Sequence, residues 1–149
     1  MRSLFEPAAA SELKDRLSKL RPESQRQWGK MSLAQALAHC SEQMEMVLGR
    51  KFTPRSLMGS VFGRFAKAKL LSEEPMPRNM PTDKNFVVND ERDLGFERDR
   101  LRTLIDEFVV GGPAGCTKHP HSFMGPMTPN EWATLMYKHF DHHLRQFGV

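Results

Sequence analysis

The sequence has 149 residues and a formal net charge of +4, from 22 Lys and Arg against 18 Asp and Glu. This length predicts one domain over residues 1–149, and the mild charge permits an anionic partner without arguing for one. No apolar run is long enough to span a bilayer, and no charged-then-apolar leader begins the chain, so we expect a cytoplasmic protein with no membrane partner. Two Cys without CxxC spacing indicate free thiols.

Periodic apolar residues predict a helical protein. Ten Met and ten Phe with one Tyr, and scarce Val and Ile, favour a helical core over a sheet. Ser32 with Gln35, and Thr128 with Glu131, have the spacing of capping boxes and indicate where two helices begin. The expected helices cover residues 8–20, 32–48, 54–70, 90–110 and, from Thr128 to a stop at Gly148, 128–148.

Four of these are the main helices, and the one over 54–70 lies within a long crossover between the second and third of them. Residues 75–81 contain three Pro, so they are expected to form a linker. Four main helices with a long crossover between the second and third predict an all-α, up-down four-helix bundle.

The stretch between residues 50 and 69 is basic. Aromatic and basic residues separate onto different helix faces there instead of interleaving, so we expect a solvated face and no nucleic-acid partner. Its cations are Arg50, Lys51, Arg55, Arg64, Lys67 and Lys69.

Three histidines lie on the inward faces of two expected helices. His139 and His143 are four residues apart, hence one turn apart, on a stripe that also carries Trp132 and Phe147. His39 lies on the inward stripe of the second helix. Three neutral imidazoles and an open position are the ligand set of catalytic zinc, although nickel, iron and manganese also accept nitrogen ligands. Hydrogen-bonded core histidines are the alternative.

Two amides lie beside these histidines. Gln43 comes one turn after His39, and Gln146 lies near His143. Both are candidates to hold a ligand ring in place or to orient an incoming group.

Four further residues near the expected site have other interpretations. Cys40 lies about 100° around the helix from His39 and is expected to be a small core residue rather than a fourth ligand. His142 lies roughly 80° from the histidine pair, as a hydrogen-bonding residue on the helix flank. Asp141 is expected on the far side, as a surface or loop-anchoring acid. Glu42 lies at the edge of its stripe and could belong to either side.

Several segments resemble the DinB-like superfamily, and more narrowly its branch of uncharacterised bacterial proteins with a domain of unknown function. The resemblance implies an up-down four-helix bundle, a homodimer, and a divalent metal, zinc or nickel, on the three histidines named above. It is carried by the segments Trp28–Cys40, His119–Thr128, Glu131–Trp132 and Lys138–Val149.

Characterised relatives in that superfamily imply a low-molecular-weight thiol as a second cofactor, activated by the metal. The resemblance does not account for the second histidine of the segment 119–123. His119 or His121 could overhang the metal as an acid–base residue, or the segment could be only a turn that leads into the last helix.

Two functions follow from these residues. The first is a metal-dependent enzyme, of transferase or hydrolase type, that activates a water or a thiol; its substrate is not identified by the pattern. The second is a metal-binding homodimer with a structural or sensing role and no turnover.

Overall fold

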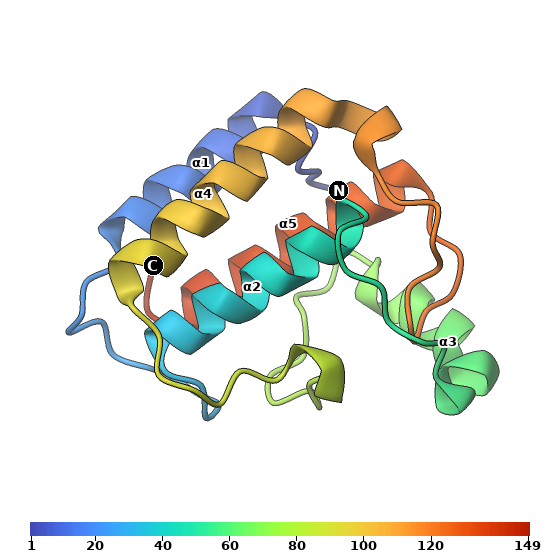
Figure 1. The fold of residues 1–149 in the computed structure, drawn as a ribbon, viewed down its shortest axis with the longest axis horizontal. Helices are drawn as coiled ribbons and strands as arrows, with labels where there is room; N and C mark the ends of the chain where they lie inside the picture. The colour runs from blue at the N-terminus through green and yellow to red at the C-terminus, as the bar shows by residue number, and fades with distance from the viewer.

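The computed structural model describes residues 1–149 and contains five α-helices, two short 3-10 helices and no strand (Figure 1). The expected all-α class is therefore confirmed. No helix combines the length and apolar character that crossing a membrane requires. The elements are α1 (Pro7–Lys19), α2 (Leu33–Val47), α3 (Leu57–Leu70), η1 (Lys84–Phe86), α4 (Leu94–Gly111), η2 (Gly112–Gly115) and α5 (Pro129–Gln146).

Both expected capping boxes are present. The Ser32 hydroxyl accepts from the Gln35 backbone N–H at 3.2 Å, and the Gln35 side chain accepts from the Ser32 N–H at 2.9 Å. Thr128 and Glu131 make the same pair of bonds at the start of α5, at 3.2 and 2.8 Å. Each box satisfies N–H groups that have no partner inside the helix, so the local sequence defines where α2 and α5 begin.

Four helices form the body, in which α2 contacts α4 and α5, and α1 contacts the same two helices from the other side. The helix directions do not alternate along the chain, as the expected up-down bundle would require. Gln35, at the start of α2, donates to Asp90 O just before α4, and Arg50, just after α2, pairs with Glu107 near the end of α4. α2 and α4 are therefore parallel, because the crossover from 48 to 93 returns the chain to the end at which α2 began (Figure 1).

The core lies between these four helices. Its largest fully buried side chains include Trp132, Phe108 and Phe140, and the ring of Phe86 from η1 closes one side. Fully burying an aliphatic or Phe side chain contributes about 1.5–3 kcal/mol relative to leaving it exposed, so this shared core supplies most of the driving force for the fold.

α3 stands apart from the four-helix body (Figure 1) and is held by small residues and polar contacts. A Cβ added at Gly59 would lie 2.5 Å from Phe123 O, and one added at Gly63 would meet the same oxygen even more closely. Arg55, just before the helix, donates to the carbonyls of residues 121, 122 and 123 at 3.1, 3.2 and 2.7 Å. The glycine face of α3 therefore packs directly on the backbone of this turn.

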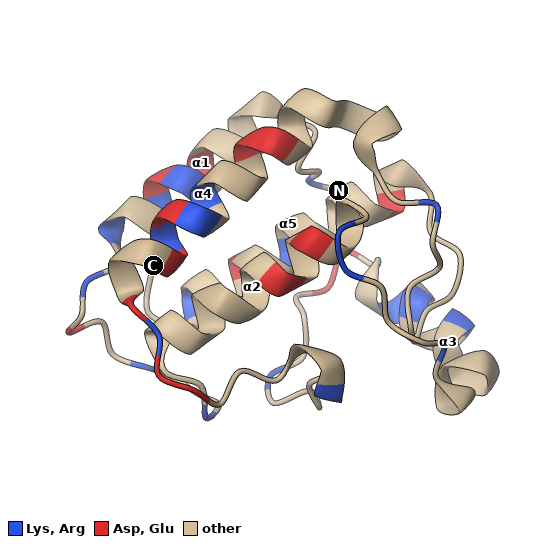
Figure 2. Ribbon diagram, viewed as in Figure 1, with Lys and Arg blue, Asp and Glu red and all other residues tan.

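This packing changes the interpretation of the basic stretch. The expected solvated face was basic, but Arg55 and Lys67 turn inward, where Lys67 pairs with Glu131. Figure 2 shows blue and no red on α3, in agreement with its lack of acidic residues. Arg64 and Lys69 stay exposed, as expected, and they share the outward side of the helix with large apolar residues that are 50–88% exposed: Leu57, Met58, Val61, Phe62 and Phe65.

We predict that Gly63→Ala lowers the free energy of unfolding by about 1–3 kcal/mol or displaces α3, because the added methyl group overlaps Phe123 O and backbone cannot yield easily. Gly111→Ala is the matched control, since nothing lies within 4 Å of a Cβ at that helical position. Urea denaturation of both variants measures the difference. Equal stability of the two variants would show that α3 is not held against the turn.

Candidate metal centre

Three imidazoles converge between α2 and α5. His39 comes from the middle of α2, and His139 and His143 come from successive turns of α5. The ring centroids are 4.9 Å apart for His39 and His139, 5.1 Å for His39 and His143, and 4.7 Å for the pair within α5. One nitrogen from each ring lies within 4.8 Å of the other two. The helical spacing in the sequence therefore does bring the three expected ligands together.

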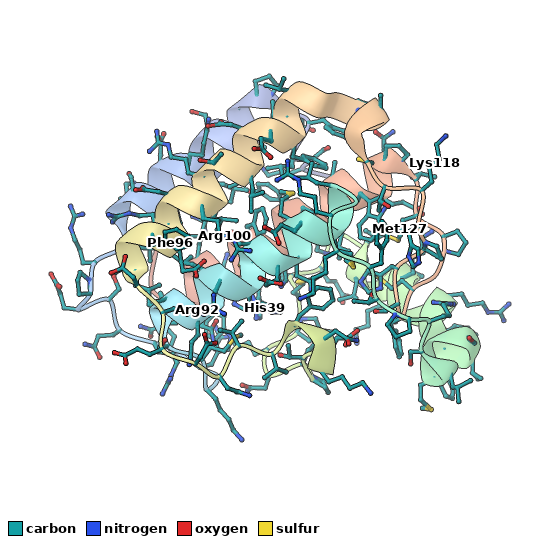
Figure 3. All side chains as sticks on the ribbon, in the orientation of Figure 1. His39, Arg92, Phe96, Arg100, Lys118 and Met127 are labelled. Carbon is teal, nitrogen blue, oxygen red and sulfur yellow. The ribbon has the colours of Figure 1, made fainter.

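The tautomer of His39 follows from its partner. Its Nδ1 lies 2.9 Å from Phe86 O, and a carbonyl oxygen can only accept, so Nδ1 carries the proton. The Nε2 lone pair is then free to bind a cation. Figure 3 labels His39 on α2, facing the crossover that supplies this carbonyl. Phe86 thus contributes its ring to the core and its backbone oxygen to the site.

A chain of two hydrogen bonds determines the tautomer of His143. The Gln146 amide donates from Nε2 to Trp28 O at 2.7 Å, which leaves Gln146 Oε1 facing His143 Nδ1 at 2.8 Å. His143 must then donate from Nδ1 and keep its lone pair on Nε2. Gly29 makes this possible: its φ is +80°, and a Cβ there would overlap the Gln146 amide.

His139 completes the group. Its Nε2 lies 3.0 Å from Nε2 of His39, and its Nδ1 is buried without a hydrogen-bond partner. Because His39 Nε2 carries a lone pair, His139 Nε2 is the donor in this contact. A cation between the rings would take the place of that proton and draw on both Nε2 lone pairs. The donor set therefore fits a metal ion.

Burial keeps these rings neutral. It lowers the pKa of His39, lowers that of His139 well below the ordinary value, and lowers the pKa of His143 to about 3. The neighbouring imidazoles add to the effect for His139, since a second charge in the cluster would be repelled. Neutral imidazole is the form that binds metal, so the site is in its binding state across the neutral range.

A family model described as "Protein of unknown function (DUF1569)" matches residues 4–148. The chain belongs to the DUF1569 family. Searches of the curated proteins and of the solved structures gave no match. The match bears out only the expectation of an uncharacterised domain of unknown function, and the DinB-like relationship stays a resemblance.

In this DUF1569 protein, two residues next to the ligands in sequence point elsewhere. His142 Nε2 accepts from Trp28 Nε1 at 3.4 Å, as expected for a hydrogen-bonding residue on the helix flank. Asp141 is not a loop-anchoring acid: it pairs with Arg16 of α1 at 2.7 Å and with Arg145 at 3.0 Å. The side of α5 that carries Asp141 therefore faces the neighbouring helix α1 instead of solvent.

Cys40 and Glu42 also lie outside the ligand group. Cys40 is buried in the apolar core, where burial raises the pKa of its thiol, as expected of a small core residue. Glu42 is at the edge of α2 and pairs with Lys51 and with Arg100, which reaches from α4 towards α2 (Figure 3). These ion pairs link α2 to α4 and to the crossover, so Glu42 has a structural role.

The remaining candidates differ in how close they come to the site. Gln43 is half-buried and its amide makes no hydrogen bond within the chain. His119 is exposed, and its ring lies against Phe52 at 5.2 Å, outside the three-histidine group. The ring of His121 lies against that of Trp132 on α5, with the ring centroids 5.6 Å apart.

His121 belongs to a tight turn that leads to α5. Its backbone exchanges two hydrogen bonds with Gly125, at 2.9 and 3.0 Å. Its Nδ1 accepts from the N–H groups of Phe123 and Met124 at 3.1 and 3.2 Å, so the ring proton is on Nε2. Burial lowers its pKa to about 4. The ring is therefore a fixed, neutral N–H donor, which the sequence pattern alone did not indicate.

The core side of the site is closed. A cavity of about 10 Å³ borders His143, and eight of its nine lining residues are hydrophobic, among them Cys40 and Phe140. That volume approaches the minimum for a single water molecule. Of the three histidines, His139 is the one that is only half-buried.

We predict that the metal-free protein loses stability as the pH falls from about 6.5 towards 4. The folded-state pKa values of His143, about 3, and His121, about 4, lie below the ordinary value of 6.5. The unfolded chain therefore binds more protons than the folded chain in this window, and acid favours unfolding; above about pH 7 the effect vanishes. Thermal melts in chelator between pH 8 and 4.5 measure the slope.

Two variants sharpen this measurement. His121→Asn keeps an oxygen that can accept the two backbone N–H groups but removes a titrating ring, so its slope should be shallower. His119→Ala removes an exposed ring and should leave the slope unchanged. A melting temperature that is flat across the window would mean that these imidazoles are not buried as neutral groups.

Proposed function

We propose that this DUF1569 protein is a divalent-metal-dependent enzyme in which His39, His139 and His143 hold the ion. The observation that supports the proposal is the convergence of three imidazoles, two of which have their Nδ1–H groups committed to Phe86 O and Gln146 Oε1. An all-nitrogen set of three leaves a coordination position for an exogenous ligand, which is the pattern of catalytic sites, and it suits zinc or nickel.

A bound ion would lower the pKa of a coordinated water or low-molecular-weight thiol and so supply a nucleophile near neutral pH. The thiol comes from the DinB-like resemblance, and the reaction class is transfer or hydrolysis. We also propose that the protein works in the cytoplasm, where thiols stay reduced, since Cys40 and Cys116 are both free.

The chain's own residues would orient the reacting groups. His121 has a neutral Nε2–H donor and is the first candidate to orient an incoming group, where it would suit an anionic oxygen or sulfur. Gln43 has a free amide one turn from His39 and is the second candidate to orient the incoming group. Gln146 acts through His143, whose ring it positions, so it is a positioning residue.

The second candidate function is a metal-binding homodimer without turnover. The packed apolar surroundings of His143, with a cavity of only about 10 Å³, favour this alternative. In that case the ion would add to stability by binding only the folded chain. The two functions differ in whether an exogenous ligand can reach the ion.

We predict that the untagged protein binds about one zinc or nickel ion per chain, the number that one three-histidine site would hold. His39→Ala, His139→Ala and His143→Ala should each abolish binding, because each removes one of three ligands. Metal analysis of protein purified without a His tag, with a chelator competition for affinity, measures both.

Two further variants test the arrangement. His142→Ala should retain most of the metal, because His142 bonds to Trp28 instead of facing the other rings. Gln146→Leu should weaken affinity by about 10–100-fold, the usual effect of losing the partner of a ligand ring. Loss of the metal in His142→Ala with retention in His143→Ala would overturn the assignment.

We predict that the cobalt- or nickel-loaded protein gains a sulfur-to-metal charge-transfer absorption when 2-mercaptoethanol is added, because the three-histidine set leaves a position open. His121→Asn should weaken this thiol binding by about tenfold, roughly the worth of one hydrogen bond to a charged group. His119→Ala is the control and should bind the thiol normally. Full metal loading with no new absorption would favour the non-catalytic function.

A further inference from the structure

A polar hollow of about 290 Å³ lies between the end of α1 and the first half of α4. Leu17 is the one hydrophobic residue that lines it, so the hollow suits a polar or charged ligand. Its volume is at the lower end of the range for small-molecule sites, about 300–1,000 Å³, which leaves room for one small ligand. The polar lining residues are Ser18, Arg21, Arg98, Asp99 and Arg102.

The three arginines of this hollow have no carboxylate partner within the chain. Arg21 donates to Ser18 O at 3.4 Å. Arg98 donates to Leu20 O at 3.3 Å, so these two arginines each use one long hydrogen bond on a carbonyl at the end of α1. Arg102 is exposed and makes no hydrogen bond or ion pair. Because a guanidinium has five N–H donors, most of the donors around the hollow face no protein acceptor.

Acidic residues compensate only part of this charge, although basic and acidic residues both occur where α1 and α4 lie side by side (Figure 2). Asp99 is the one carboxylate that lines the hollow. Asp106, further along α4, is paired with Lys14. Asp15 and Glu23, the other acids near the end of α1, are exposed and do not line the hollow. Three arginines and one aspartate therefore leave the hollow with a net charge of about +2.

The arrangement of the arginines favours a dianion with several oxygens. Arg98 and Arg102 are four residues apart and so lie on the same face of α4, where two like charges repel each other. An anion between them would remove that repulsion. The planar guanidinium donates to phosphate oxygens in pairs. A phosphomonoester carries a charge of about −1.5 to −2 at pH 7, which matches the hollow, whereas a monocarboxylate matches only half of it.

The lining does not suit a nucleic-acid strand. Proteins that bind single strands combine basic grooves with aromatic side chains on which the bases stack. None of the six residues that line the hollow is aromatic. Asp99 would also repel the next phosphate of the same strand. A single phosphate group on a small molecule is therefore the ligand that fits best.

We propose that this hollow binds the dianionic phosphate group of a small molecule, either inorganic phosphate or a phosphomonoester, and that Arg21, Arg98 and Arg102 hold it. The site is separate from the metal centre, because none of the three histidines there lines the hollow. The proposal therefore does not rest on the proposed function. It adds a second ligand to the protein, held between α1 and α4.

The test is isothermal titration calorimetry of the full chain with inorganic phosphate and with phenyl phosphate, at constant ionic strength and above the second pKa of phosphate, about 6. The wild type should bind one phosphate per chain. Arg102→Ala should weaken binding by about tenfold or more, because it removes charge-assisted hydrogen bonds. Arg64→Ala is the matched control and should bind normally, since Arg64 is also exposed and without an ion pair but lies on α3.

Two further variants identify the position of the anion. Asp99→Asn should bind phosphate about two- to fivefold more tightly, the range for one exposed charge pair, because it removes a carboxylate that repels the ligand. His139→Ala should bind phosphate as the wild type does, because the hollow does not include the metal centre. Circular dichroism on the same samples confirms that each variant is folded.

Phosphate binding that is lost in His139→Ala and kept in Arg102→Ala would place the anion on the metal and overturn the proposal. No binding by the wild type, or equal loss in Arg64→Ala, would also overturn it. So would a single-stranded oligonucleotide that binds more tightly than phenyl phosphate through Arg102, which would make the hollow part of a nucleic-acid surface. Binding of both phosphates supports a phosphomonoester as the ligand, and binding of inorganic phosphate alone supports free phosphate. Absence of metal from every preparation would refute the proposed function and leave these outcomes unchanged.

Discussion

Burying three neutral imidazoles between two helices requires a partner for each ring nitrogen that does not face the ion, and the structure around α2 and α5 meets this requirement twice. His39 uses the carbonyl of Phe86, and His143 uses Gln146, which is itself held by Trp28 O. An unpartnered buried polar atom costs about 1–3 kcal/mol, so these contacts stabilise the fold as well as orient the rings. Through these bonds the crossover at Phe86 and the α1–α2 connection at Trp28 are held against α2 and α5.

Electrostatics around the site divide into a neutral interior and a charged flank. The ligand rings have lowered pKa values because they are buried, whereas Arg100 on the flank has a raised pKa through Glu45 and Glu42, which outweigh its own burial. Arg100 and Arg92 also contact Glu97, which is only 1% exposed. Removing either arginine would leave that carboxylate less compensated, which is costly in a buried position. This network holds α4 parallel to α2 without placing a charge among the imidazoles.

Much of this protein could be predicted from local pattern. Capping residues and apolar periodicity place the helices to within a few residues, and the four-residue spacing of His139 and His143 gives their shared face. The partners of the rings could not be predicted, because a backbone carbonyl such as Phe86 O has no sequence signature.

Two other features depend on tertiary contacts in the same way. Asp141 was expected at the surface and instead meets Arg16, because which helix borders α5 depends on the path of the crossover. The orientation of α3 could not be predicted from the sequence either. Its apolar residues have helical spacing, but Gly59 and Gly63 are the residues that approach the backbone of Phe123, and the large apolar residues remain outside. Small residues can dominate packing when backbone meets backbone, and periodicity of large residues does not detect this.

The molecule therefore separates two tasks between its helices and its connections. α2 and α5 hold the imidazole nitrogens beside an apolar core, where the cavity that borders His143 is too small for a substrate. The crossover supplies the carbonyl that holds His39, and it is linked to the 121–125 turn, since Asp83, just before η1, accepts from the Ser122 hydroxyl at 2.8 Å. A change in the crossover would therefore reach His121 and Phe86 together. If the proposed function holds, relatives that keep the three histidines but differ in these connections would keep the metal and differ in what reaches it, because function depends on the site built onto the fold.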